Sequence, residues 1–193
     1  MALATTVGIT LEKTLMNSGK ERKISKKVCL LGPFAVGKTS LVRRFIYNRF
    51  EDRYVSTIGV KVSRKIVMTP HNNDIIELSI MLWDIAGADE VDELRRSYLN
   101  GVAGAILVCD LTRRETIDKM TAYAKAIHAI TPQAPLVLAA NKLDLMQERV
   151  VNDQMLQNVA QQLGSSLHLV SAKTGDHVEA LFKELASLLV QNV

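Results

Sequence analysis

Apolar and polar positions follow two different periods along this chain, and together they predict an α/β fold. Short, nearly continuous apolar runs are typical of strands that are covered on both faces. The predicted strands cover residues 28–31, 60–69, 74–83, 102–109, 136–140 and 167–170. Segments with the apolar spacing of amphipathic helices lie between most of them. These predicted helices cover residues 38–48, 90–99, 114–130, 153–163 and 176–190. The alternation predicts a doubly wound, mainly parallel sheet of six strands flanked by about five helices.

One connection in this pattern is too short for a helix. Pro70-His71-Asn72-Asn73 supplies turn-forming residues between the strands at 60–69 and 74–83, which are therefore predicted to form a hairpin. In open α/β sheets, ligands bind beyond the carboxyl ends of the strands. The polar motifs described below fall at such strand ends, so we expect them to share one edge of the sheet.

The composition is that of a globular chain. Its 193 residues suffice for one domain with a buried core, and 48% apolar with 23% charged residues exclude a disordered chain. No apolar run has the length of a membrane span, and the N-terminus lacks the apolar centre of a signal peptide. Cys29 and Cys109 lie inside apolar runs, which favours reduced thiols in a cytoplasmic protein over a disulfide or a metal site.

Residues 1–24 are predicted to be a flexible leader, and residues 25–193 the folded domain. A basic cluster precedes the first predicted strand. Its members are Lys20, Arg22, Lys23, Lys26 and Lys27. They form either a solvated charge run or a contact for an acidic partner or membrane surface. The net charge of +4 is too small and too scattered to indicate nucleic-acid binding.

Residues 32–39, with the pattern Gly-x-x-x-x-Gly-Lys-Thr, join a predicted strand to a predicted helix, which is the context of a phosphate-binding loop. Gly32 and Gly37 permit turns that point backbone N–H groups at a phosphate, and the start of the helix adds more. Lys38 would place its charge on the outer phosphates, and Thr39 would offer a hydroxyl to Mg²⁺. The alternative is an ordinary turn with Lys38 in solvent. The predicted nucleotide contacts here are Gly32, Ala35, Val36, Gly37, Lys38, Thr39 and Ser40.

Further motifs occur in order along the chain. They are Thr57 in a polar loop, Asp84-Ile85-Ala86-Gly87, Asn141-Lys142-Leu143-Asp144 and Ser171-Ala172-Lys173. With the phosphate loop they resemble the Ras-like small GTPases, nearest to the Rab-like branch and its bacterial relatives. The resemblance covers about residues 26–190. It implies the P-loop GTPase fold and a protein that binds GTP or GDP with Mg²⁺.

The resemblance assigns base recognition to two of these loops. The carboxylate of Asp144 would accept hydrogen bonds from the ring N–H and the amino group of guanine, and adenine would leave it unpaired. Asn141 would brace the base and the neighbouring loops, and the stem of Lys142 would cover one face of the ring. The Ala172 amide, flanked by Ser171 and Lys173, would meet the guanine carbonyl.

The resemblance likewise assigns Mg²⁺ and the γ-phosphate. Thr39, Thr57 and Asp84 would be the metal ligands, which is enough because Mg²⁺ keeps several waters. The Gly87 amide would meet the γ-phosphate. Together with Lys38 on the outer phosphates and Thr57 on Mg²⁺, Gly87 completes the set of predicted catalytic residues.

Two aromatic residues complete the predicted site. Phe50 would lie against guanine, with ordinary packing as the alternative, and Tyr54 would close over the phosphates. Residues 50–60 and 84–98 would order around the γ-phosphate and present that state to effectors and to an activating or exchange factor. The protein is expected to be a monomer or weak dimer with a role in signal transduction.

Two positions depart from the family pattern in ways that affect hydrolysis. The glutamine that orients the attacking water is replaced by Ala88, and a normally small residue of the phosphate loop by Phe34. Both changes predict weak intrinsic hydrolysis. Asp89 or Glu90 could position water, Arg53 could act as an internal arginine finger, or a partner could supply one; otherwise these three are surface charges.

The end of the chain also departs from the family. No cysteine follows Cys109, and Met1 is followed by Ala2, so neither a prenyl nor a myristoyl anchor is expected. Any membrane contact would then be electrostatic or through a partner.

Three functions remain open at this stage. The first is a GTPase switch that is slow alone and stimulated by a partner. The second is a scaffold that holds guanine nucleotide without hydrolysing it. The third, an adenine-nucleotide kinase or ATPase, would require Asp144 to be incidental.

Overall fold

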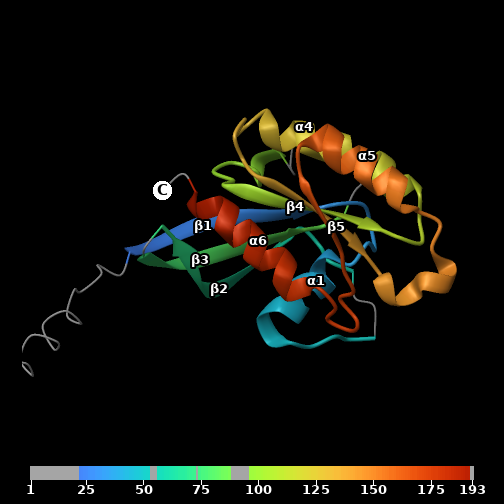
Figure 1. The fold of residues 1–193 in the computed structure, drawn as a ribbon, viewed down its shortest axis with the longest axis horizontal. Coiled ribbons are helices and arrows are strands. Elements are labelled where there is room, and N and C mark those ends of the chain that lie inside the picture. The colour runs from blue at the N-terminus through green and yellow to red at the C-terminus, as the bar shows by residue number, and fades with distance from the viewer. Residues whose placement is uncertain (1–21, 53–55, 73, 88–95, 192–193) are drawn as a thin grey trace, which may run out of the picture.

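The computed structural model describes residues 22–52, 56–72, 74–87 and 96–191. Its centre is a six-stranded sheet in the order β2-β3-β1-β4-β5-β6, in which only the β2–β3 pair is antiparallel (Figure 1). The strands are β1 (Arg22–Leu31), β2 (Val60–His71), β3 (Asp74–Ile85), β4 (Gly104–Asp110), β5 (Leu136–Asn141) and β6 (Ser166–Leu169). The predicted mainly parallel α/β sheet is confirmed.

Helices cover both faces of this sheet (Figure 1). They are α1 (Lys38–Tyr47), α3 (Glu115–Asp118), α4 (Met120–His128), the 3₁₀ helix η1 (Leu143–Glu148), α5 (Asp153–Leu163) and α6 (Val178–Val190). α1 and α6 pack on one face with Val28 and Leu30 of β1, and α4 and α5 on the other with Cys29 and Leu31. This alternation follows from the two-residue period of a strand. No helix in the described ranges is long and apolar enough to cross a membrane.

α1, which begins at the phosphate loop, is fixed to α6 by a ring contact. Phe45 stacks on Phe182 with ring centroids 3.9 Å apart and planes inclined by 6°. Both rings are buried in the core of that face. The polar side chains of α1 are consequently held in a set orientation toward the loops after β5 and β6.

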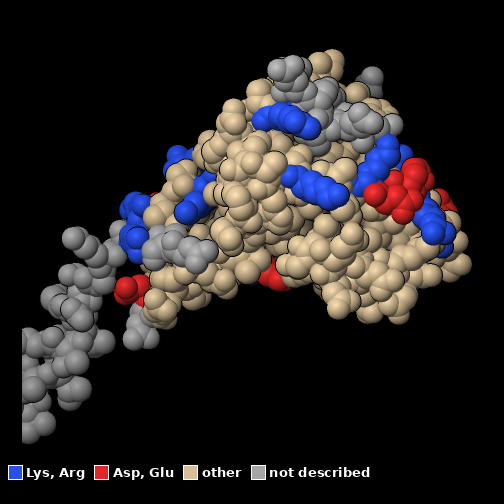
Figure 2. Space-filling model, turned by 90° about the horizontal axis from the view of Figure 1, so that it is seen from above, with Lys and Arg blue, Asp and Glu red and all other residues tan. Residues whose placement is uncertain are grey.

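The structure corrects some predicted boundaries. β1 begins at Arg22 rather than at residue 28, because its polar first half pairs with β3 from Ile76 onward. Four of the five residues of the predicted basic cluster therefore lie on a strand. Figure 2 shows Lys and Arg side chains spread among uncharged residues on the face that it draws.

The hairpin and one helix also differ from prediction. Pro70 and His71 belong to β2 instead of the turn, which proline tolerates because β2 is an edge strand. The helix predicted at 114–130 is two helices, separated at Lys119. Most of the helix predicted at 90–99 lies outside the described residues.

The carboxyl ends of the parallel strands meet at one edge of the sheet. β1 ends at Leu31, β3 at Ile85, β4 at Asp110 and β5 at Asn141. The loops that follow these strands are therefore neighbours in space, and the predicted site residues lie in or beside them.

Candidate nucleotide-binding site

A cavity of about 340 Å³ opens at this edge of the sheet. The predicted site residues that line it are Ala35, Gly37, Lys38, Thr39, Ser40, Phe50, Thr57, Gly87, Asn141, Lys142, Asp144, Ala172 and Lys173. Gly32, Val36, Asp84 and Ser171 are not on the wall but contact residues that are. The sequence did not single out the lining residues Arg43, Glu51, Asp52 and Leu145. Tyr54 lies outside the described residues.

The two glycines of the phosphate loop are required by close approach of their neighbours. A Cβ on Gly32 would lie 2.2 Å from the Val108 carbonyl oxygen, and one on Gly37 would lie 2.2 Å from Nδ2 of Asn141. Both residues also have positive φ, +154° and +100°, where a side chain is strained. The loop can therefore reach this conformation only with glycine at both positions.

Lys38 is folded back over the phosphate loop. Its ammonium donates hydrogen bonds of 2.8 Å to the Gly32 carbonyl and 2.9 Å to the Pro33 carbonyl, and the residue is only 6% exposed. A buried ammonium is expensive unless it is bonded, and these carbonyls supply partners. Its charge is thus held beside the first turn of α1, in the wall of the cavity.

Asn141 joins the phosphate loop to the loop after β6. Its buried amide donates 2.8 Å from Nδ2 to the Val36 carbonyl, and its Oδ1 accepts a 3.1 Å bond from the Ala172 amide. Both polar atoms of one side chain are satisfied by backbone groups of two distant loops. Asn141 therefore links the phosphate loop to the loop after β6.

The carboxylate of Asp144 is held in the cavity wall by Ser171. Its Oδ1 accepts a 2.6 Å bond from the Ser171 hydroxyl, whose oxygen in turn accepts the Thr174 amide at 3.1 Å. This fixed hydroxyl orients an acceptor group toward the space that a base would occupy. The arrangement can pair with a planar ring that presents two adjacent donors.

Three oxygen-bearing side chains cluster at the other end of the cavity. The Thr39 hydroxyl donates a 2.5 Å bond to Oδ2 of Asp84 and lies 2.7 Å from the Thr57 hydroxyl. Oδ1 of Asp84 is buried and has no hydrogen-bond partner among the described residues. Burial raises the pKa of Asp84, against the Thr39 bond and the charge of Lys38.

This cluster has the donor chemistry of a hard divalent cation. Two hydroxyls and one carboxylate are oxygen ligands of the kind that Mg²⁺ accepts alongside water. A buried carboxylate oxygen without a hydrogen-bond partner is unfavourable, and a bound cation would satisfy it. In the described ranges, no group of three His, Cys, Asp or Glu side chains is placed to hold a metal.

Arg44 on α1 contacts the loop after β6 in a way that the sequence did not reveal. Nε donates 3.0 Å to the Ala172 carbonyl, and Nη2 donates to the Lys173 carbonyl. Nη1 donates 3.2 Å to both the carbonyl and the side-chain oxygen of Asn48. The only hint in the sequence is a basic residue in the last turn of a predicted helix.

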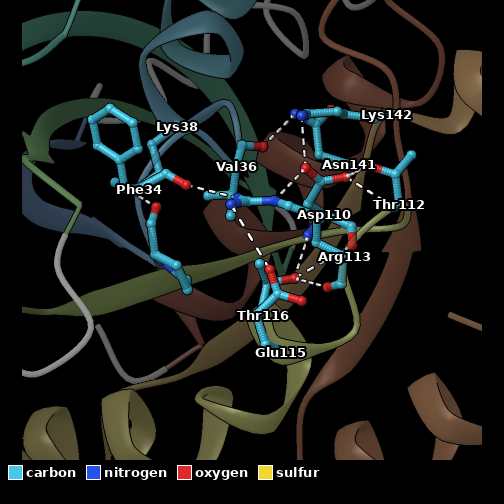
Figure 3. Close-up of polar contacts among 11 residues, drawn as sticks. Phe34, Val36, Lys38, Asp110, Thr112, Arg113, Glu115, Thr116, Asn141 and Lys142 are labelled. Carbon is cyan, nitrogen blue, oxygen red and sulfur yellow. Dashed lines mark hydrogen bonds and ion pairs between the residues drawn. The ribbon is translucent and has the colours of Figure 1, made fainter. Parts of the chain in front are cut away.

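A second polar network lies beneath the phosphate loop (Figure 3). Asp110, at the end of β4, accepts from Lys142 at 2.6 Å and from Nε of Arg113 at 3.1 Å. Arg113 also reaches the Phe34 carbonyl at 2.7 Å. The ammonium of Lys142, whose stem was predicted to cover one face of the base, is thus paired with a buried carboxylate. Asp110 and Arg113 were not predicted as site residues.

The residues predicted to affect hydrolysis are only partly described. Phe34 lines the cavity and is 51% exposed. Arg53, Ala88, Asp89 and Glu90 lie outside the described residues.

Known proteins resemble this chain over nearly the same span. It matches the Ras family over residues 27–191. The GTP-binding protein ypt4 of Schizosaccharomyces pombe is 30% identical over 169 residues, which are 86% of this chain and 72% of ypt4. The Ras-related protein Rab-4 of Dictyostelium discoideum is 31% identical over 168 residues, 86% of this chain and 80% of Rab-4. The Ras-related protein Rab-10 of Caenorhabditis elegans is 31% identical over 166 residues, 85% and 80% of the two chains.

The sheet order, with a Gly-x-x-x-x-Gly-Lys-Thr loop between β1 and α1, defines a P-loop nucleotide-binding domain. Within that class, this chain belongs to the Ras family of small GTPases and resembles its Rab-like branch. It is a small GTP-binding protein of the switch type.

Proposed function

We propose that this protein is a GTP/GDP switch that binds guanine nucleotide with Mg²⁺ in the cavity and hydrolyses GTP slowly without a partner. The observation that carries the proposal is the pair of bonds made by Asn141. They tie the Val36 carbonyl of the phosphate loop to the Ala172 amide of the loop that faces Asp144. A ligand with phosphates at one end and a hydrogen-bonding base at the other would reach from the phosphate loop to the loop that faces Asp144.

Guanine is the base that suits the polar end of the cavity. Asp144, oriented by Ser171, offers acceptors to the ring N–H and the amino group of guanine. Adenine has no donors in that arrangement and would leave a desolvated carboxylate unpaired, which costs enough to reject it. This argument separates a GTPase from the adenine-nucleotide kinase or ATPase.

The residues at the phosphate end would hold the metal and the γ-phosphate. Thr39, Thr57 and Asp84 are the proposed Mg²⁺ ligands, and when bound the metal neutralises phosphate charge. Lys38 would add a positive charge, and the Gly87 amide a donor. Gly87 lies so close to the phosphate loop that a Cβ there would be 2.6 Å from the Pro33 carbonyl oxygen.

Weak unaided hydrolysis is the finer part of the proposal. The methyl group of Ala88 cannot hydrogen-bond the attacking water, as the usual glutamine would. The exposed ring of Phe34 lines the cavity beside Gly87, where it would crowd the γ-phosphate or an incoming arginine. A stimulating partner would therefore have to supply charge, and also a water-orienting group unless Asp89 or Glu90 positions the water.

The partner surface would comprise residues 50–60 and 84–98, in which Thr57 and Gly87 would contact the γ-phosphate. Effectors that bind only the ordered form would then respond to the nucleotide. We also infer a cytoplasmic location, which the free, buried thiols of Cys29 and Cys109 support.

The test begins with the nucleotide that purified protein carries. Denatured protein should release GDP or GTP, and single-turnover assays should show GTP loss that is slow and accelerated by cell extract. Bound GTP that never turns over, with or without extract, would favour the alternative, a scaffold with guanine nucleotide as a structural ligand.

Base recognition is tested separately by substitution. Asp144→Asn should lose GTP affinity by at least roughly 100-fold and gain affinity for xanthine nucleotides, because an amide donates where the carboxylate accepted. Asp74→Asn, an exposed carboxylate at the start of β3, is the matched control. Unchanged GTP binding in Asp144→Asn would contradict the assignment.

A further inference from the structure

The guanidinium of Arg113 bridges the end of β4 and the backbone of the phosphate loop. Nε donates 3.1 Å to Oδ2 of Asp110, and Nη2 donates 2.7 Å to the carbonyl oxygen of Phe34, which lies 79 residues earlier in the chain (Figure 3). Planar, forked donors of this kind can hold two acceptors at fixed relative positions. Arg113 therefore sets the distance between Phe34 and the buried carboxylate.

Asp110 is a rigid anchor for that bridge. It is fully buried, and it accepts hydrogen bonds of 2.9 and 2.7 Å from the amide and the hydroxyl of Thr112 and of 2.6 Å from the ammonium of Lys142. Burial alone would raise the pKa of Asp110, but the bonds from Lys142 and Thr112 outweigh it and hold that pKa below its ordinary value. The carboxylate is consequently charged at neutral pH and cannot turn.

The turn that carries Arg113 is also fixed. The Thr116 hydroxyl donates 2.6 Å to the Arg113 carbonyl, and its oxygen accepts the Asp110 amide at 2.9 Å. Thr116 is fully buried. The backbone of Arg113 is thus held by Thr116 and its Nε by Asp110, and its Nη2 extends from this fixed position to the phosphate loop.

The carbonyl that Arg113 holds lies at a demanding point of the phosphate loop. The next residue, Ala35, has φ of +60°, in the left-handed region that is unfavourable for any residue with a Cβ. On the other side, Gly87 approaches so closely that a Cβ there would be 2.7 Å from Cα of Phe34. The backbone at Phe34 is therefore held between Arg113 and Gly87, the residue proposed to contact the γ-phosphate.

We propose that Arg113 is a positioning residue of the phosphate loop. Anchored by Asp110, it fixes the Phe34 carbonyl, the left-handed turn at Ala35 and the backbone against which Gly87 packs. This inference rests on the proposed function, because the property that it controls is retention of the nucleotide's phosphates. Arg113 is not among the residues proposed to hold the base or the metal. Its loss should therefore loosen the phosphates without changing which base is preferred.

The test measures release of fluorescent GDP and GTP from the full-length protein with Mg²⁺. Arg113→Gln, which cannot pair with Asp110 and hold Phe34 in the same way, should release both nucleotides roughly 10-fold faster. The preference for GDP over xanthosine diphosphate should stay unchanged. Arg113→Lys should restore only part of the nucleotide retention, because an ammonium lacks the planar, forked set of donors of a guanidinium. Arg114→Gln, at the exposed neighbouring arginine, should behave as wild type.

Two further readouts separate positioning from general stability. The ¹⁵N resonance of the Ala35 amide should shift in Arg113→Gln and not in Arg114→Gln, because that amide adjoins the held carbonyl. In the Ala35→Gly background the effect of Arg113→Gln on release should shrink, since glycine adopts the left-handed turn without strain.

The outcomes are distinguishable. Release rates that agree within twofold for Arg113→Gln, Arg114→Gln and wild type would overturn the inference while leaving the proposed function intact. If Arg113→Gln does not fold, Arg113→Lys carries the same comparison. Wild-type protein that binds no guanine nucleotide would contradict the proposed function, and an unshifted Ala35 resonance in the Arg113 variants would then overturn the positioning role as well.

Discussion

Arg44 donates a 3.0 Å hydrogen bond from Nε to the carbonyl oxygen of Ala172, a residue 128 positions further along the chain. The same guanidinium donates to the Lys173 carbonyl and to both oxygens of Asn48. Asn48 lies two residues before Phe50 in the chain, and Phe50 lines the cavity. One side chain of α1 therefore holds the loop proposed to contact the base and the start of the segment that passes around the cavity.

We expect Arg44→Ala to weaken guanine-nucleotide binding. Loss of a charged donor to two carbonyls should cost about 1.5–3 kcal/mol of binding free energy, which is roughly a 10- to 150-fold faster release of GDP. Because the contact is to the loop whose Ala172 amide would meet the guanine carbonyl, discrimination between GDP and ADP, which has an amino group in place of that carbonyl, should fall as well. Arg44→Lys should be intermediate, and Arg49→Ala, at an exposed arginine after α1, is the control. Release at the wild-type rate would show that the Arg44 contacts are not needed to keep the loop in place.

Asp110 should make stability depend on pH in the acid range. Because its folded pKa is lowered, the stability from its charge is fully present above the ordinary value of about 4 and is lost as pH falls through the lower folded value. Asp110→Asn should reduce the free energy of unfolding at pH 7 by about 3–5 kcal/mol, since Lys142 and Arg113 lose a buried partner. Urea unfolding from pH 7 to pH 3 should show that the difference in unfolding free energy between wild type and Asp110→Asn shrinks below about pH 4. A constant difference would mean that Asp110 contributes through packing instead.

Both cysteines should resist alkylation in the folded protein. Burial raises the pKa of the thiols of Cys29 and Cys109 to about 12, so the reactive thiolate is scarce at pH 8. Iodoacetamide at pH 8 should leave the native protein unmodified for hours and label both residues in urea, as read by mass spectrometry. Rapid labelling of Cys109 without denaturant would indicate that β4 opens locally.

The two departures that affect hydrolysis should act together. Ala88→Gln alone should accelerate single-turnover GTP hydrolysis only slightly, because the proposed crowding of the γ-phosphate by Phe34 would remain. Phe34→Gly with Ala88→Gln should exceed the product of the single effects by roughly 10-fold or more. A strictly multiplicative result would show that the ring and the missing glutamine act independently.

Gly32 offers a test of close packing against backbone strain. Gly32→Ala and Gly101→Ala both add a Cβ at positive φ, but only the first would meet a backbone carbonyl, 2.2 Å away, whereas Gly101 faces open space. Gly101→Ala should lose about 1 kcal/mol of unfolding free energy, and Gly32→Ala roughly 1–3 kcal/mol more, together with nucleotide binding. Equal losses would mean that the loop shifts to admit the methyl group.

Contacts that are local in sequence were predictable, and contacts across the fold were not. The phosphate loop and the segment 141–144 could be identified because neighbouring residues carry their chemistry. Arg44 and Arg113 were missed because each bonds a carbonyl 128 or 79 residues away, and a carbonyl acceptor leaves no mark in the sequence. The first half of β1 was missed because backbone pairing with β3, rather than apolar side chains, makes it a strand.

The β2–β3 hairpin has a mechanical consequence for the two ends of the site. The Ala86 amide donates 2.9 Å to the Gly59 carbonyl, so the hairpin is closed where Thr57 enters it and Gly87 leaves it. A slip of one residue between the strands would turn every side chain to the opposite face, so the strands cannot slide past each other. The threonine and the glycine are therefore the two ends of a single ribbon. A displacement at either end is passed directly to the other across the Gly59–Ala86 bond, while the twelve paired residues of each strand keep the register fixed.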